Sequence, residues 1–520
     1  MPVTRIESRE TRTDVAVETA VGVLPATPQW KTVDLNSYSD AKVEFTGTSR
    51  SVMTSSRGVK KGVQTDLTAD FGYNIDNTGD NVLAQMASFL FSVPKERATR
   101  SIIAGAPKVT LATNKITAMT ATTVTMTTAQ SFIAGDLLIV SDGVNDRSVQ
   151  RVVSVTALVI TVAPAYTGGA PIVPQTPLRG DARVVKVGVR ATAAATLTGA
   201  ASSVTLALGA PAITALALNV GEWVFIGGDN VGTKFVNTEP FYARISAISS
   251  TTLTFDATTR PVAVTPENLT GIDLFFGTFI SDGKDTISFT HSRYLGKDDA
   301  DKHMRETYTG GIASEMSLNM EAKSLVTCDF SYKCLTGDMV ALDNAAHTLA
   351  YPETVPALDG EAISTVTDIY RQRLVIPQLG VVNPAAIHAF VKTLSLNVTN
   401  NLTMDDAQGV LGSIGATAGD FTATGSMQVY LVSTKIREAI RCNCTAALDI
   451  ICARKNAGFV VDVPALTLGN GSINIEKGQS VTIDLDQAAF ESSRGYTMSY
   501  TNFHYLPSVA MPAGSTGCAC

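Results

Sequence analysis

The chain has 520 residues, of which 45% are hydrophobic and only 17% are charged, and its formal net charge is −7. This length allows several domains, and the acidic balance argues against a protein that reads nucleic-acid sequence through a basic surface. No apolar run approaches the ~18 residues of a membrane-spanning helix. Residues 1–10 lack the apolar core of a signal peptide, so we expect synthesis and folding in the cytoplasm.

The low charge content is informative about the kind of surface. Soluble domains carry about 25% charged residues, whereas Thr, Ser, Ala and Gly make up much of the remainder here. Low charge with abundant Thr and Val favours β structure whose surface is partly covered by neighbouring subunits. An Ala-rich composition with no such meaning is the alternative. The seven cysteines are an odd number without the spacing of a disulfide framework.

The first hundred residues predict an arm, a hairpin and a helix. Residues 1–42 have few periodic signals and predict an extended N-terminal arm with Trp30 as its anchor. Residues 43–73 predict a β-hairpin whose tip, 55–62, is basic and contains glycine. A helix follows, with Asp80 or Asn81 as the N-cap and Pro94 as the stop. Its apolar stripe is Val82, Leu83, Met86, Phe89 and Leu90.

Residues 105–278 differ in character, because acids become sparse and Thr, Val and Ala dominate. They contain an internal repeat, in which 135–143 resembles 221–229 and 151–161 resembles 244–255. Each unit opens with a Thr-rich strand. We expect two small tandem β-barrels or sandwiches, 105–190 and 191–278, inserted into a host domain.

The stretch 285–338 has the period of two that is typical of strands. Residues 287–292 alternate between apolar and polar side chains, and a polar connection at 296–311 follows. The runs 315–322 and 326–334 alternate in the same way, with a turn at Lys323 and Ser324. These runs predict a half-buried antiparallel sheet with one wet face. We expect its apolar face to pack on the helix at 81–91, and the connection at 296–311 to contact another subunit.

Residues 346–385 form a proline-containing linker, after which the host pattern recurs. A strand, a Gly-rich excursion at 400–424, a returning strand and a helix at 435–441 capped by Ser433 or Thr434 follow in order. The runs 472–475 and 481–485 then parallel the two runs of the first stretch. We therefore assign a first domain to 43–104 with 279–345 and a second to 386–508, with a C-terminal tail at 509–520. The expected fold class is mainly β, with a duplicated domain that carries one flanking α-helix per copy.

Two loops contain residue types that bind ligands elsewhere. Residues 227–234 are rich in glycine and contain a lysine, but a phosphate-binding loop needs Lys before Ser or Thr and a helix directly afterwards. A hairpin turn is the better interpretation. Asp298, Asp299 and Asp301 could hold a cation, but they lack calcium-loop spacing, and a solvated loop is favoured.

No other cluster predicts chemistry. The later cysteines lack the paired spacing of zinc sites and predict buried or tail thiols: Cys442, Cys444, Cys452, Cys518 and Cys520. The histidines are scattered at His291, His303, His347, His388 and His504. We find no nucleophile elbow and no defensible carboxylate pair. We therefore assign no catalytic, cofactor-binding or metal-binding residue and expect no enzymatic activity.

The arrangement resembles the tail tube, or major tail, protein family of bacteriophages with long, flexible, non-contractile tails. The N-terminal Gly/Pro segment with Trp30, the hairpin and capped helix at 43–91, and the run from Ile287 through 308–318 to 326–332 carry this resemblance. The match covers residues 15–100, 279–345 and 386–506. The insertion at 105–278 and the second copy depart from the simplest pattern of the family.

The resemblance implies a virion structural protein that forms stacked rings around a channel for double-stranded DNA, with the hairpin loop reaching the next ring. It implies a tape measure protein and DNA in the lumen, and tail terminator and tail tip proteins at the ends of the tube. Because single-copy members form hexamers, a duplicated chain favours a trimer with pseudo-sixfold symmetry, with a hexamer next. The insertion would then face outward. Asp329, Asp484 and Asp486 are candidates for the lumen face, and a solvated outer face is the alternative.

Other classes remain open at this point. A capsid or decoration protein would also suit an assembly subunit. A β-repeat adhesin is disfavoured because the chain shows no signal peptide, and a carbohydrate-active enzyme would need a carboxylate pair in a cleft.

Overall fold

The computed structural model describes residues 11–25, 28, 30–50, 60–78, 82–92, 116–127, 131–142, 144–145, 147–175, 183–200, 203–262, 264–298, 300–342, 362–377 and 381–512. Strands dominate these ranges, which confirms the mainly β class. The α-helices among the described residues are α1 (Leu83–Phe89) and α3 (Lys435–Arg441).

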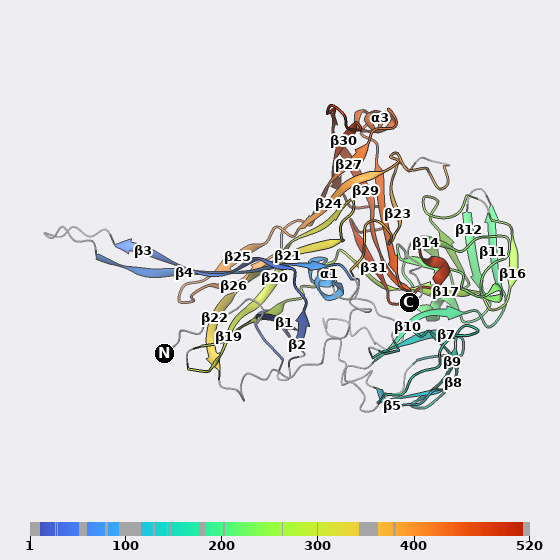
Figure 1. The fold of residues 1–520 in the computed structure, drawn as a ribbon, viewed down its shortest axis with the longest axis horizontal. Helices are drawn as coiled ribbons and strands as arrows, with labels where there is room; N and C mark the ends of the chain where they lie inside the picture. Colours follow the sequence, from blue (N-terminus) through green and yellow to red (C-terminus); the bar gives the residue numbers. More distant parts are fainter. Residues whose placement is uncertain are drawn as a thin grey trace.

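One large antiparallel sheet is built from both ends of the chain (Figure 1). Its strands from the first part of the chain are β1 (Arg12–Val17), β2 (Trp30–Val33), β3 (Ser37–Arg50), β4 (Lys60–Asp76), β18 (Thr278–Ser281), β19 (Phe289–Lys297), β20 (His303–Glu321), β21 (Thr327–Cys334) and β22 (Thr336–Leu342). Its strands from the last part are β23 (Ile369–Val375), β24 (Val391–Thr399), β27 (Thr422–Tyr430), β28 (Ala446–Arg454), β29 (Ala457–Asn474), β30 (Thr482–Ala489) and β31 (Ser499–Phe503).

A continuous antiparallel path crosses this sheet in the order β3–β4–β21–β20–β24–β27–β30–β29. The first four strands precede residue 343, and the last four follow residue 390. The pair β20–β24 joins the two groups through the register Glu315↔Thr399 to Glu321↔Thr393. The two halves of the chain therefore share one sheet.

The strands around this path pair in matching ways. In the first group β1 pairs with β19, β19 with β20, and β20 with both β21 and β22. In the second group β23 pairs with β28, β28 with β29, and β29 with both β30 and β31. A short helix follows β4 in the first group and β27 in the second.

The apolar side chains of the path form one core, because alternate residues of each strand point to the same face. The core joins both groups, from Phe71 and Phe330 to Leu396 and Leu485. The ring of Phe89 in α1 lies 5.2 Å from the rings of both Phe330 and Tyr332. The expected packing of the sheet on the helix at 81–91 is therefore confirmed for the described residues.

The segment between α1 and β18 forms a second antiparallel sheet. Its strands are β5 (Ile116–Met119), β6 (Thr123–Met126), β7 (Asp136–Ser141), β8 (Gln150–Thr156), β9 (Val159–Pro164), β10 (Arg183–Arg190), β11 (Ala195–Ala200), β12 (Ser203–Leu208), β13 (Trp223–Ile226), β14 (Phe241–Ile248), β15 (Thr252–Phe255), β16 (Glu267–Leu269) and β17 (Asp273–Phe276). Two hydrophobic clusters divide it, one around Val140 and one around Leu253. The link between them is β10, which pairs with β7 on one side and β17 on the other.

A third apolar cluster fixes the second sheet to the large one. Trp223 and Tyr242 pack there with Val460 and Phe503 of the large sheet. At its edge Arg244 makes two bonds of 2.7 and 2.9 Å to the carboxylate of Asp462, and both side chains are nearly fully buried. An ion pair buried in this way is costly to break from one side. The second sheet therefore packs against the large sheet, on the side of the molecule away from the β3–β4 hairpin (Figure 1).

Three expectations about strands differ from the structure. The N-terminal arm is anchored by the buried Trp30, as predicted, but it enters the large sheet as β1 and β2, and β3 begins at Ser37 rather than near residue 43. The polar connection predicted at 296–311 is mostly strand, because only 298–302 separate β19 from β20. Short polar side chains and glycines there suggested a loop, but both neighbouring strands β19 and β22 hydrogen-bond to this part of β20.

The wet face predicted for residues 287–292 is also wrong. Ser288, Thr290 and Ser292 are buried, and side chains from the N-terminal arm and from β20 reach this side of β19. The Thr290 hydroxyl donates a 2.6 Å hydrogen bond to the Glu18 carboxylate, and Arg305 donates one of 2.7 Å to the Ser292 hydroxyl. The polar side chains are therefore satisfied inside the protein rather than by water.

Several predicted helix signals lie outside the described residues, namely Asp80, Asn81 and Pro94, as do residues 55–59 of the hairpin tip and 346–361 of the linker. At α1 the N-cap position is Val82, which makes no side-chain cap. At α3 the N-cap position is Thr434, also without a side-chain cap, while the Ser433 hydroxyl accepts a 3.1 Å bond from the Lys435 backbone N–H.

Candidate functional site: a polar sheet face and two free edges

One face of the eight-strand path is polar throughout. The alternate residues that oppose the core are Thr, Ser, Asn, Asp or Glu at nearly every position of β4, β21, β20, β24, β27 and β30. Its acidic side chains include Asp40, Glu44, Asp70, Asp76, Glu315, Glu321, Asp329, Asp484 and Asp486. Lys333 and Lys42 are basic residues on the same face, and both lie within 4 Å of Asp70. The polar face is therefore acidic.

Asp329 holds the centre of the first strand group. Its carboxylate lies on β21 between two amide donors, one on each neighbouring strand. Asn74 of β4 donates to Oδ1 at 2.7 Å, and Asn319 of β20 donates to Oδ2 at 2.8 Å. Hydrogen bonds to an ionised acceptor are short and strong, so the two amides fix this negative charge on the polar face.

Asp484 holds the same place in the second strand group. Gln428 of β27 donates to its Oδ1 at 2.8 Å, and Asn474 of β29 donates to its Oδ2 at 2.7 Å. We call these two arrangements the Asp329 clamp and the Asp484 clamp. Each clamp has a carboxylate on the third strand of its group and amides on the second and fourth.

Hydroxyls extend the polar network across the β20–β24 pair. The Ser395 hydroxyl donates to Asn319 Oδ1 at 2.9 Å, so it extends the Asp329 clamp into the second group. The Ser317 hydroxyl donates to Asn397 Oδ1 at 2.7 Å beside it. Short polar side chains thus hydrogen-bond to one another across this pair of strands.

The two ends of the path are free edges among the described residues. Strand β3 is paired only with β4, and residues 467–474 of β29 are paired only with β30. Such edges carry unpaired N–H and C=O groups that can pair with another chain. Apolar side chains are exposed along both, with Ile475 76%, Phe45 60% and Ile473 36% accessible.

A pocket of about 480 Å³ opens beside the β29 edge. It lies between α3 and the strand, and it is lined by Thr434, Arg437, Glu438, Ile440, Arg441, Asn470 and Gly471. Gly471 has φ +78°, and a Cβ there would meet Ile440 at 3.0 Å. This glycine therefore permits both the bulge in β29 and the close approach of α3.

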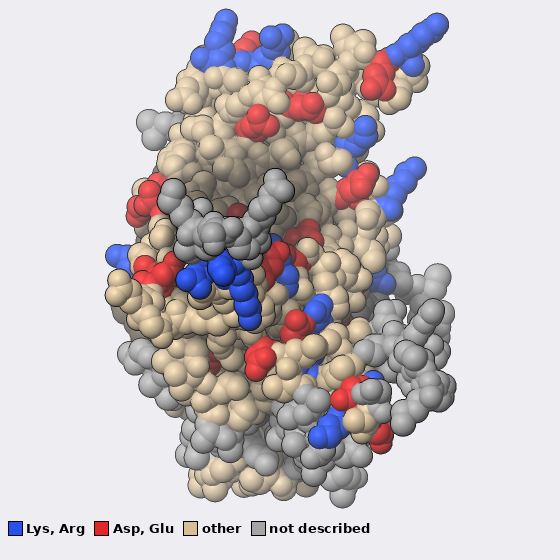
Figure 2. Space-filling model, turned by 90° about the vertical axis from the view of Figure 1, so that its left-hand side faces the viewer, with Lys and Arg blue, Asp and Glu red and all other residues tan. Residues whose placement is uncertain are grey.

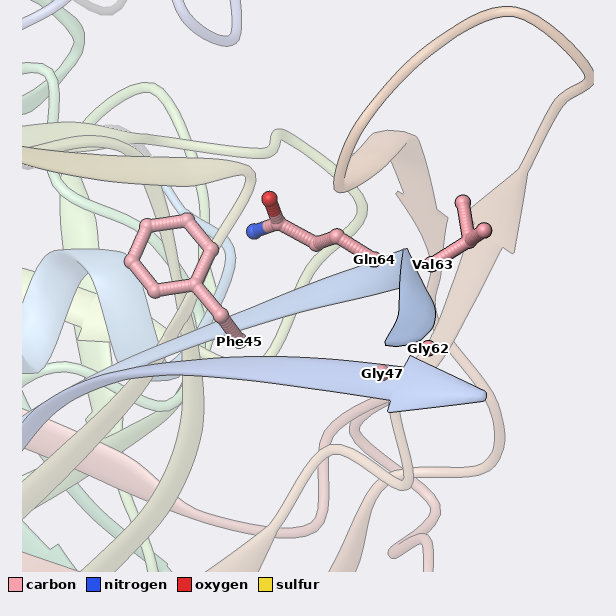
Figure 3. A pocket seen from close by; sticks show the side chains of 5 residues that line it. All are labelled: Phe45, Gly47, Gly62, Val63 and Gln64. Carbon is pink, nitrogen blue, oxygen red and sulfur yellow. The ribbon is translucent and has the colours of Figure 1, made fainter. Parts of the chain in front are cut away.

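The long hairpin of β3 and β4 projects from the body beyond the other strands (Figure 1). A shallow hollow of about 410 Å³ lies on it, lined by Phe45, Gly47, Gly62, Val63 and Gln64. Phe45 and Gln64 extend over the same side of the hairpin (Figure 3). Seen from the hairpin side, uncharged residues cover most of the molecule, with acidic and basic side chains thinly spread (Figure 2).

The predicted glycine loop is a connection within a hairpin. β13 and β14 pair on either side of it, and a 3-10 turn at Val231–Thr233 lies inside, capped by Asn230. A Cβ on Gly228 would meet the Asp273 carboxylate at 2.5 Å, which leaves no room for a phosphate at that point. The hairpin interpretation of residues 227–234 is confirmed.

The predicted aspartate cluster forms a turn. Asp298 accepts hydrogen bonds from the backbone N–H groups of Ala300 and Lys302, and Asp301 pairs with Lys297 at 2.8 Å. Asp299 lies outside the described residues. Across the described ranges no group of His, Cys, Asp or Glu has the geometry of a metal site.

Within the described ranges, the cysteines and histidines do not form a metal-binding group. Cys442, Cys444 and Cys452 are free thiols, and Cys452 is buried. Burial lowers the pKa of His291 to about 3 and that of His388 to about 4. His303 contacts the Tyr294 hydroxyl at 2.9 Å, and His504 contacts the Thr278 hydroxyl at 2.8 Å. His347, Cys518 and Cys520 lie outside the described residues.

The amides of the two clamps were not predicted from the sequence, although the sequence contains a repeated pattern that includes one amide of each clamp. Residues 317–319 read Ser-Leu-Asn and 472–474 read Ser-Ile-Asn, while 327–329 read Thr-Cys-Asp and 482–484 read Thr-Ile-Asp. Residues 317–319 and 327–329 supply one amide and the carboxylate of the Asp329 clamp, and 472–474 and 482–484 supply those of the Asp484 clamp. Only the strand register shows that these two tripeptides meet on one face.

Among the described residues no helix is both long and apolar enough to cross a membrane. A model of the family described as phage tail tube protein matches residues 9–490. The search of curated proteins found no match.

Proposed function

The chain belongs to the phage tail tube protein family, and from this premise we propose that it is the tube subunit of a long, non-contractile phage tail. Membership implies self-assembly into a tube and a place in the virion. In our proposal the subunits form rings, the rings stack around a central channel, and DNA leaves the virion through that channel. The role is structural and involves no catalytic step.

The proposal includes a duplicated tube domain. Matching strand pairings, a helix at the same place and the two clamps support it. The first copy comprises 43–104 with 279–345, and the second comprises 386–508. The insertion is made of 105–190 and 191–278, and the tail is 509–520. The linker, 346–385, contains β23, which pairs with β28 of the second group, and the arm, 1–42, contributes β1, β2 and the start of β3 to the first group.

The main support for a ring is the β20–β24 strand pair inside the chain. It joins the fourth strand of the first group to the first strand of the second. Within the described residues, 467–474 of β29, the fourth strand of the second group, and β3, the first strand of the first group, each have one unpaired edge. Repeating the internal joint between chains would pair β29 of one copy with β3 of the next. Such a heterologous contact closes into a ring when the rotation allows it, and closure removes the exposed edges.

The expected ring is a trimer with pseudo-sixfold symmetry. A chain with two copies of the domain would fill two of six equivalent places, so three chains would complete the ring. The polar face would line the channel, because the opposite face is covered by α1, α3 and the core. An acidic wall attracts no phosphate, so DNA would pass without being held.

The insertion would lie on the outside. It packs behind β28, β29 and β31, away from the polar face, through the cluster around Trp223 and Phe503. In the assembled tail we place the tape measure protein and DNA in the lumen, and the terminator and tip proteins at the two ends. Assembly would take place in the cytoplasm of the host bacterium.

Negative-stain microscopy of the purified protein tests the proposal. We expect rings or tubes at high concentration. A sample that stays monomeric, or that forms closed shells, would contradict it.

A test of the channel wall uses tubes made with Asp486→Lys, because Asp486 is exposed on the polar face and belongs to neither clamp. We expect these tubes to retain double-stranded DNA at low salt, in a manner that salt reverses. Wild-type tubes should release it. Equal retention by both kinds of tube would place the polar face elsewhere.

A further inference from the structure

We propose that Phe45 of one chain inserts into the pocket between α3 and β29 of the adjacent chain in the same ring. The inference rests on the proposed pairing of β29 with β3. It adds the side chain that anchors the joint and the pocket that receives it. The partner is therefore a second copy of this chain.

The internal joint provides the template. There β24 lies along β20, with Val398 opposite Met316, and Asn400 follows the strand. Asn400 is 2% exposed, and its amide donates to the backbone carbonyls of Phe89 at 3.1 Å and Ala313 at 3.0 Å. The residue after β24 therefore fills the space between the end of α1 and strand β20.

The two helices can be matched residue by residue. Each ends with a residue at positive φ, Phe91 at 46° and Asn443 at 48°. The same backbone bonds surround both ends, with Ser92 N–H to Ala87 C=O in one and Cys444 N–H to Ala439 C=O in the other. This match places Arg441 of α3 where Phe89 stands in α1.

The strands can be matched through the clamps. Asn74 and Gln428 are equivalent, because each donates to the clamp carboxylate. Thr68 and Thr422 each lie six residues earlier on the same strands. Their cross-strand partners are Glu44 and Thr399. The position of Asn400, directly after Thr399, therefore corresponds to Phe45.

The pocket and the side chain fit each other. Phe45 points to the core side of β3, because it lies opposite the buried Leu67, yet it is 60% exposed. In the equivalent space beside α3 nothing in the described chain takes the place of Asn400, and the 480 Å³ pocket is open there. Ile440 supplies an apolar wall, and Arg437 and Arg441 can lie over the face of an aromatic ring.

The same matching gives the register of the joint. Glu44 would lie opposite Gly469, Lys42 opposite Ser472 and Asp40 opposite Asn474. Each of these pairs between chains is equivalent to one β20–β24 pair within the chain. The exposed Ile473 and Ile475 would then be covered by Ala41 and Tyr38.

Photo-crosslinking tests the proposal in the full-length chain. A benzoylphenylalanine is placed at residue 45, and isotopically labelled and unlabelled chains are mixed so that cross-links between chains can be recognised. We expect links from residue 45 to 434–441 or 468–471 of another chain. The same probe at Val63, farther out on the hairpin and beyond the joint, should not link to α3. If the labelled chains form rings but residue 45 links to another surface instead, the proposal is overturned.

Assembly gives a second readout. Phe45→Ala should raise the protein concentration needed for assembly by about tenfold or more, because the burial of the phenyl side chain between chains is lost. Phe45→Trp should stay close to the wild type. If wild-type rings form and Phe45→Ala assembles equally well, the anchor is wrong while the proposed function stands. If the wild type forms no rings, the proposed function itself fails.

Discussion

At the scale of single residues, the polar face depends on carboxylates that are held by amides on both sides. Asp329 and Asp484 each accept two amide hydrogen bonds from neighbouring strands. Asp486 is on the same face but is exposed. The clamps therefore have a structural task, linking three strands, in addition to the charge they give to the face.

The first prediction compares clamped and exposed carboxylates. Asp329→Ala leaves the amides of Asn74 and Asn319 without their acceptor, so the free energy of unfolding should fall by about 1–3 kcal/mol. Asp486→Ala is the matched control, and it should change stability by less than about 0.5 kcal/mol. Urea unfolding followed by circular dichroism measures both. Equal effects would show that the clamp does not bind the strands together.

His291 makes a second prediction, about pH. Its ring lies 4.6 Å from Phe71 and 4.5 Å from Tyr332 by centroid, fully buried, and burial lowers its pKa from 6.5 to about 3. The unfolded chain takes up a proton below about pH 6.5, whereas the folded chain does not until about pH 3. Stability should therefore fall as the pH falls through this window, by up to about 1.4 kcal/mol per unit. His388, with a pKa of about 4, acts in the same direction.

The control for this effect is His291→Phe, which keeps an aromatic ring in the same core. Thermal unfolding between pH 7 and pH 4 should show a shallower decline for the variant than for the wild type. Parallel curves would mean that the imidazole does not contribute to the acid sensitivity.

At the scale of elements, the alternation of apolar and polar residues is sufficient to predict strands of the central path. It is not sufficient to predict what lies against each face of a strand. The runs at 315–322 and 326–334 fold as predicted, because one face is core and the other is polar. The run at 287–292 has the same pattern, but its polar side chains are buried and hydrogen-bond to Glu18 and Arg305. A period of two in the sequence shows that one face of a strand is polar, but it does not show whether that face contacts water or a hydrogen-bonding part of the protein. The clamps could not be predicted for a related reason, since they depend on cross-strand register.

The third prediction concerns the free edge of β29. Ile473→Lys with Ile475→Lys adds charge to side chains that are already exposed, so the monomer should stay folded. Ring formation should be lost, because charged side chains on an edge oppose strand addition. Ile414→Lys, at another exposed isoleucine in the β25 (Thr403–Asp406) and β26 (Ser413–Thr417) hairpin, is the control. Size-exclusion chromatography with light scattering reports both. Rings from the double variant would contradict the proposed edge pairing.

The fourth prediction concerns the attachment of the insertion. Arg244→Met leaves the buried Asp462 carboxylate without its cation, and the free energy of unfolding should fall by about 3–5 kcal/mol. Arg244→Met with Asp462→Leu removes both charges and should recover part of this loss. Thermal unfolding measures the two variants. A double variant as unstable as the single one would show that the pair is not the source of the effect.

At the scale of the whole molecule, the proposed ring rests on one family assignment and on one strand pair inside the chain. The family match covers residues 9–490 and implies a tube. The internal β20–β24 pair and the two free edges supply the joint from which we build the ring. In the proposed ring, the packing of the second sheet against β28, β29 and β31 would place one insertion per chain on the outside.

The most direct test is a two-dimensional class average of the assembled protein viewed down the tube axis. We expect an inner wall of sixfold appearance around an open channel, with three insertions on the outside. Six insertions around the ring would mean six chains and would contradict the duplicated-domain trimer. Insertion density inside the channel, or the absence of a ring, would contradict the account as a whole.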